Sequence, residues 1–140
     1  MTVPMPRRKD WQQRLEAHFG ACRRRAFEHG TRKHDCAQLA AGAVEAVTGY
    51  RPFADLEYSD AVSGLLALRR AGHGDHIAAA RWLFPEIPAA EASIGDLAVV
   101  DGDGGPALAV VAGAGEVLFV ARPVGIGVLP MSAAYAVLKV

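Results

Sequence analysis

The stretch HDCAQLAAGAVEAVTG (34–49) carries the strongest periodic signal in the chain. Its apolar residues recur every three or four positions, which is the spacing of one face of an α-helix. Asp35 is placed to accept hydrogen bonds from the first helical turn, and Gln38 follows three residues later, as in a capping box. Gly49 stands where a left-handed C-cap favours glycine. The pattern predicts a helix that begins at Cys36 and ends before Gly49.

Three further helices are expected around this one. Apolar residues at helical spacing predict one helix over 11–25, before it, and two over 56–71 and 75–84, after it. Asp75 is the expected N-cap of the last helix. Residues 1–10 contain two prolines and no apolar period, so they are expected to form a flexible N-terminal arm.

After Ser93 the sequence changes to short runs of β-type residues separated by glycine and proline. The five expected strands cover 96–100, 107–112, 117–121, 125–129 and 135–140. The acidic, glycine-rich segment 101–106 is the expected hairpin turn between the first two. Helices followed by antiparallel strands predict one α+β domain over 11–140, with the Cys36 helix at its centre and a barrel-like, five-stranded C-terminal sheet.

Composition narrows the classes of protein that this chain can belong to. It has 140 residues, of which 51% are hydrophobic and 21% charged, so it can bury one core and is not a disordered chain. Lys+Arg and Asp+Glu number 15 each, so no net field favours nucleic acid or an anionic membrane surface. We therefore expect no nucleic-acid partner.

The sequence also bears on localisation. Nothing at the N-terminus resembles a signal peptide, and two cysteines are too few for a disulfide scaffold. The longest run without a charge, 104–115, is too short for a spanning helix and is interrupted by glycine and proline. We expect a soluble protein made in the bacterial cytoplasm, with no membrane span.

His34, Asp35 and Cys36 form the constellation with the clearest chemical rationale. A thiol at a helix N-terminus experiences the positive end of the helix dipole, which favours the nucleophilic thiolate. The adjacent Asp35 carboxylate opposes this effect. The alternative is that Cys36 is simply a small buried apolar residue on the helix stripe.

The order of motifs resembles the NlpC-type papain-like cysteine peptidases. An Asp-Cys pair opens a helix at Asp35, and Gly95-Asp-Leu97 begins a later strand. The chain is more similar still to short NlpC-like proteins from the tail modules of phages, prophages and gene-transfer agents. That similarity extends from Trp11 to the C-terminus and rests on these short segments: Phe27–Gly30, His34–Cys36, Thr48–Gly49, Gly95–Leu97, Pro106–Gly113 and Ala136–Val140.

The resemblance implies a role for particular residues. Cys36 matches the nucleophile, Asp35 acts as the helix cap, and the position of the catalytic histidine is occupied by Ala107. Alanine cannot accept a proton, so the resemblance favours a component that acts structurally in tail assembly or at the tail tip. Its partners would be other proteins of the tail tip or hub, and the protein would be incorporated in the virion tail.

The alternative is an active cysteine peptidase or amidase that cuts peptidoglycan stem peptides when the genome enters the cell. Cys36 would be the nucleophile, and His34 the candidate base, with His29 and His76 as further possibilities for a displaced base. No cofactor is expected. No metal is expected either, because His73, Asp75 and His76 lie within four residues and rarely close a tetrahedral site by themselves.

Overall fold

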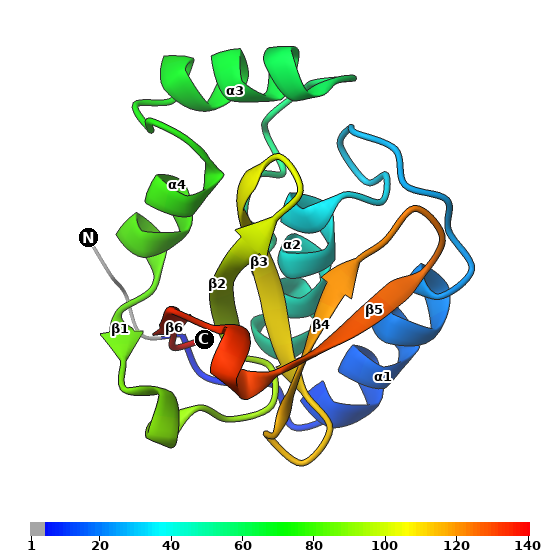
Figure 1. The fold of residues 1–140 in the computed structure, drawn as a ribbon, viewed down its shortest axis with the longest axis vertical. Helices are drawn as coiled ribbons and strands as arrows, with labels where there is room; N and C mark the ends of the chain where they lie inside the picture. Colours follow the sequence, from blue (N-terminus) through cyan, green and yellow to red (C-terminus); the bar gives the residue numbers. More distant parts are fainter. Residues whose placement is uncertain (1–4) are drawn as a thin grey trace.

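The structure, a computed structural model, describes residues 5–140. It is an α+β domain in which four helices precede a six-stranded antiparallel sheet (Figure 1). The helices are α1 (Trp11–Cys22), α2 (Cys36–Thr48), α3 (Ala61–Arg70) and α4 (His76–Leu83). The strands are β1 (Glu86–Ile87), β2 (Leu97–Gly102), β3 (Gly105–Ala112), β4 (Val117–Ala121), β5 (Ile126–Pro130) and β6 (Ala136–Leu138), with 3-10 turns η1 (Ala89–Glu91) and η2 (Met131–Ala133).

Helix α2 has the predicted bounds and caps. Asp35 Oδ1 accepts a hydrogen bond from the Gln38 N–H at 2.8 Å, and Gly49 adopts φ 87°, the left-handed conformation that glycine allows without strain. The Gln38 side chain does not complete the expected capping box. Its Oε1 accepts a hydrogen bond from the Arg32 N–H at 3.1 Å instead, so the side chain holds the preceding loop.

Two other helices are shorter than the apolar spacing predicts. Helix α1 ends at Cys22 rather than at residue 25. Helix α3 begins at Ala61 rather than at residue 56, because Asp60 and Ser63 form a reciprocal capping box that defines its first turn. Helix α4 lies within the predicted range and is capped by Asp75, whose side chain accepts from the Ala78 N–H.

The sheet has one strand more than predicted, and it is open rather than barrel-like. Its order is β1-β6-β2-β3-β4-β5, so β1 and β5 are free edges. The additional strand β1 pairs with β6 through Glu86 opposite Leu138 and Ile87 opposite Val137. Two residues are too few to give an alternating pattern, which explains why β1 could not be predicted.

The two faces of the sheet bury different sets of residues. Alternate residues of β2 and β3, such as Leu97, Val99, Leu108 and Val110, pack against α1 and α2 in the main core. Figure 1 shows these two helices behind the sheet, whereas α3 lies apart at one end. The opposite face forms a second cluster, covered by apolar residues from the segments around η1 and η2.

Residues 5–10 are anchored to the domain. The Arg8 N–H donates to the Val47 carbonyl at 2.8 Å, and Arg7 NH1 donates to the Ile94 carbonyl at 2.7 Å. Of the flexible arm expected over 1–10, residues 1–4 lie outside the described part of the chain. The rest is held by backbone and guanidinium hydrogen bonds that apolar periodicity cannot indicate.

Candidate functional site

The candidate site is a cysteine and a histidine contributed by the first residues of two different helices. Cys36 begins α2 and His76 begins α4. The distance from Cys36 Sγ to His76 Nε2 is 3.6 Å, which is hydrogen-bond range for a sulfur donor. A thiol within reach of an imidazole is the basic unit of cysteine nucleophilic catalysis.

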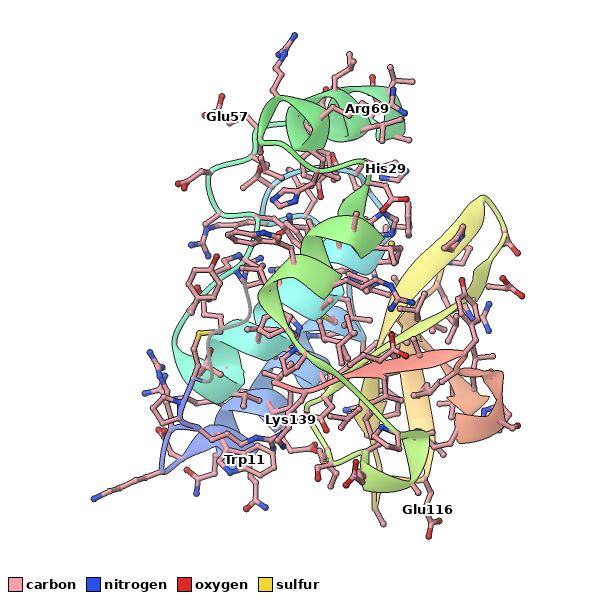
Figure 2. The ribbon with its side chains drawn as sticks, turned by 90° about the vertical axis from the view of Figure 1, so that its left-hand side faces the viewer. Trp11, His29, Glu57, Arg69, Glu116 and Lys139 are labelled. Atoms are coloured by element: carbon pink, nitrogen blue, oxygen red, sulfur yellow. The ribbon has the colours of Figure 1, made fainter. Side chains whose placement is uncertain are left out.

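This pair lies at the wall of a cavity of about 430 Å³. The cavity extends from the N-terminal ends of α2 and α4 to α3, and Gly104 and Pro106 of the β2–β3 hairpin also line it. Figure 2 shows two other lining residues, His29 and Arg69, at the same end of the molecule, with Arg69 on α3. The volume is that of a small-molecule or side-chain binding pocket.

Burial favours the neutral form of both members of the pair. It raises the pKa of the Cys36 thiol to about 11, with the Asp35 carboxylate contributing in the same direction. Burial also lowers the pKa of His76 below its ordinary value, although the Asp75 and Asp35 carboxylates act against this. The resting site is therefore a neutral thiol beside a neutral imidazole, in which His76 is in the form that accepts a proton.

The raised thiol pKa predicts slow alkylation that accelerates with pH. In a Cys22→Ala protein, the rate constant for Cys36 with iodoacetamide should increase about tenfold per pH unit up to a pKa of about 11, because only the thiolate reacts. An ordinary thiol would level off near 9.0. Mass spectrometry of the alkylated peptide measures the rate. A plateau below pH 7 would contradict the neutral pair and indicate a thiolate–imidazolium pair.

Asp35 is the buried support of the site, as its predicted role of helix cap requires. Besides the Gln38 N–H on Oδ1, its Oδ2 accepts from the Tyr58 hydroxyl at 2.6 Å and from the Gly30 N–H at 3.3 Å. Its side chain is almost fully buried, and these donors replace the water that an ionised carboxylate requires. Asp35 thus joins the loop before α2 to the segment before α3.

Tyr58 and Arg51 extend this support, and sequence reasoning identified neither. The Gln38 Nε2 donates to the Tyr58 hydroxyl at 3.1 Å, and Arg51 NH2 donates to Gln38 Oε1 at 2.7 Å. Burial, followed by the hydrogen bond to Asp35, raises the pKa of Tyr58. Arg51 lies between the predicted helices, and Tyr58 falls in the part of the predicted helix over 56–71 that is not helical, so no spacing signal pointed to their contacts.

The structure gives the other two candidate bases different surroundings. His34 is buried, and its Nε2 donates to the Gly125 carbonyl at 2.8 Å, which ties the loop before α2 to the β4–β5 turn. His29 Nδ1 lies 3.7 Å from Asp35 Oδ2, and its ring lines the cavity. The imidazole that the structure brings to the Cys36 thiol is that of His76, rather than His34.

Ala107, the position matched to the family's catalytic histidine, lies on the far face of the sheet from α2. Successive side chains of a strand point to opposite faces. Leu108 packs in the main core with α2, whereas Ala107 packs against the second cluster. A histidine at 107 would therefore face away from Cys36, and alanine there does not by itself remove the base.

Two further features bear on what the site can hold. Among residues 5–140, no group of three or more His, Cys, Asp or Glu side chains is arranged to bind a metal ion. Within the same residues, no helix is both long and apolar enough to span a bilayer.

Comparison with known proteins gives one match. A family model described as "Domain of unknown function (DUF6950)" matches residues 6–140. No curated protein and no solved structure matches the chain.

Proposed function

The chain belongs to the family described as a domain of unknown function (DUF6950), and we propose that it is a thiol-dependent hydrolase. Cys36 is the nucleophile and His76 the general base. The observation that carries the proposal is the 3.6 Å approach of Sγ to Nε2 at the wall of a cavity. A cysteine at a helix N-terminus packed against an antiparallel sheet accords with an NlpC-type papain-like arrangement, which we propose as the fold family.

In the proposed reaction His76 Nε2 takes the thiol proton as Cys36 Sγ attacks a carbonyl carbon. The backbone of Leu108, followed by that of Ala37 and Cys36, lowers the pKa of the thiol against the larger effect of burial, and the first N–H groups of α2 have no intrahelical acceptor. These groups can stabilise the oxyanion that develops on the carbonyl oxygen. The imidazolium then protonates the leaving group, and water hydrolyses the thioester.

The resemblance to tail-module proteins supplies a biological setting for this proposal. In that setting the protein is part of a phage or prophage tail tip, and the bonds cut are those of peptidoglycan stem peptides. A second candidate is a tail component that acts only through its surface on other tail proteins. It is favoured by one observation, the burial that holds the Cys36 pKa at about 11, because a thiol kept protonated is a poor nucleophile.

Trapping the covalent intermediate tests the hydrolase. The purified protein is mixed with an activated ester, quenched in acid after a few milliseconds to seconds, and digested for mass spectrometry. We expect the acyl mass on the peptide that contains Cys36, and its disappearance with time as the thioester is hydrolysed. Cys36→Ala should give no adduct, and Cys22→Ala, which removes the other free thiol, should behave like the wild type.

Two outcomes would contradict the hydrolase. One is an adduct that forms equally on Cys22 and Cys36, and only after the protein is unfolded. The other is a Cys36 adduct that is never hydrolysed. Either result would favour the tail component that acts only through its surface. Peptidoglycan fragments, used in place of the ester, then test the substrate that the resemblance implies. A hydrolase of other acyl groups would turn over the ester and leave these fragments intact.

A further inference from the structure

Much of the cavity wall is apolar. Seven of the lining residues have wholly apolar side chains, namely Ala37, Phe53, Leu56, Ala61, Leu65, Leu68 and Pro106. Phe53 adopts φ 64°, a left-handed backbone conformation that is rare for a bulky residue and costs energy. A strained residue in a cavity wall indicates that the surrounding structure holds it there.

The carboxylates and the tyrosine hydroxyl of the wall are already hydrogen-bonded within the chain. Asp60 Oδ1 accepts from the Ser63 N–H at 2.7 Å and Asp75 Oδ1 from the Ala78 N–H at 2.7 Å, so both carboxylates serve as helix caps. Asp35 and Tyr58 bind each other. Beyond the Cys36–His76 pair, the Arg69 guanidinium and the His29 ring, the surface that lines the cavity is mainly apolar.

Helix α3 presents two different faces that make this wall testable. Leu65 and Leu68 line the cavity, whereas the adjacent Leu66 points outward and is 46% exposed. Gly64 also lines the cavity, and a Cβ at this position would come within 3.0 Å of the Tyr58 ring. The absence of a side chain at Gly64 therefore lets α3 approach the site closely enough to form the wall.

The chemistry of acyl transfer decides which part of a substrate meets this wall. His76 must protonate the leaving group, so the leaving group lies on the α4 side of Cys36. The acyl group stays bonded to sulfur in the thioester and extends to the other side. The apolar surface available to it within the cavity includes Leu56, Leu65 and Phe53.

From this placement we infer that the substrates carry an aliphatic acyl group next to the scissile bond, bound in the cavity between α3 and α2, and that Leu65 is a specificity-determining residue. The inference rests on the proposed hydrolase and names its substrate class. In the step itself, the S–C bond forms as the bond to the leaving group breaks, and the thiol proton passes through His76 to the leaving group. Water then cleaves the S–C bond, giving the free acid and restoring the thiol.

The test compares 4-nitrophenyl esters of acetic, hexanoic and decanoic acid with those of N-acetylglycine and N-acetylleucine. We expect kcat/KM to rise about fourfold for each methylene that is buried, until the cavity is filled. Straight-chain esters represent a lipid acyl group, and the leucine ester represents an apolar amino-acid side chain. The decanoyl ester is compared with the acetyl ester, and the N-acetylleucine ester with the N-acetylglycine ester. The comparison with the larger increase in kcat/KM identifies the source of the acyl group.

Leu65→Glu and Leu66→Glu are the matched variants on the same helix. Leu65→Glu should lower kcat/KM for the decanoyl ester about tenfold or more and leave the acetyl ester close to wild type. Leu66→Glu should keep the wild-type preference. If Leu65→Glu does not fold, Leu65→Ser is used in its place. This smaller change should give an intermediate loss of kcat/KM for the decanoyl ester. Equal rates for acetyl and decanoyl esters, or a preference that survives both Leu65 variants, would overturn the inference.

A binding measurement separates this inference from the proposed function. Decanoate is titrated into Cys36→Ala protein, with and without Leu65→Glu, by isothermal titration calorimetry. If the wild type hydrolyses none of the esters, but decanoate binds to Cys36→Ala protein in a way that depends on Leu65, the hydrolase is refuted and the apolar site is kept. Hydrolysis without such binding or chain-length preference would keep the hydrolase and refute the aliphatic specificity.

Discussion

Replacing His76 with alanine is expected to lower the rate of ester hydrolysis by about two to four orders of magnitude. Its Nε2 lies 3.6 Å from Cys36 Sγ, and burial holds the pKa of that thiol at about 11. Without a base to take the proton during attack, only the very small thiolate fraction present at neutral pH can react. The measurement is kcat/KM for an activated ester with wild type and variant at one pH.

His73→Ala is the matched control for this prediction. His73 packs against Trp82, with ring centroids 5.6 Å apart, and is outside the set of described residues that line the cavity. Its removal should leave kcat/KM unchanged. Free imidazole added to His76→Ala should restore part of the rate, because it can enter the space left by the side chain. Equal activity of the two variants would exclude His76 as the base.

Much of the helical part of this fold could be predicted because its signals are local. The bounds of α2 follow from one apolar stripe, the Asp35 cap and Gly49, and the structure confirms all three. The capping box at Asp60 was also present in the sequence, but the apolar residues that precede it suggested an earlier start for α3. Local caps therefore define helix ends better than apolar spacing does.

The site was only partly predictable because its members come together through the tertiary fold. Cys36 and Asp35 were identifiable from their place at a helix start. The partner of the thiol, His76, lies 40 residues further along the chain, and sequence left it as one of several histidines. The register of β3 decides which residues face α2, so the consequence of alanine at 107 could not be judged before the strand was placed.

Asp35 links the stability of the site to its chemistry. It opposes ionisation of the Cys36 thiol and favours a positive charge on His76, so its two effects on a thiolate–imidazolium pair are of opposite sign. Its main contribution is then structural, since one carboxylate holds the start of α2, the Gly30 loop and Tyr58. A rigid support of this kind keeps the Cys36 thiol in place and in its neutral form.

The largest expected effect on stability comes from Asp96, in the Gly-Asp-Leu segment before β2. Its side chain is fully buried. Oδ1 accepts from the Val140 N–H at 3.0 Å and from Arg7 NH2 at 3.1 Å, and Oδ2 accepts from the Ser93 N–H at 2.9 Å. The carboxylate therefore holds both ends of the described chain to the start of the sheet.

Asp96→Ala should lower the free energy of unfolding by about 3–5 kcal/mol, because it leaves the Arg7 guanidinium without its ion-pair partner and the N–H groups of Val140 and Ser93 without their acceptor. Urea denaturation followed by circular dichroism measures this loss, which is a large part of the stability of a domain of this size. Asp101→Ala provides the control, since Asp101 is exposed on β2 and its removal should change stability by less than about 0.5 kcal/mol. Similar midpoints for the two variants would mean that Asp96 does not anchor the termini, and the Gly-Asp-Leu segment would then need another explanation.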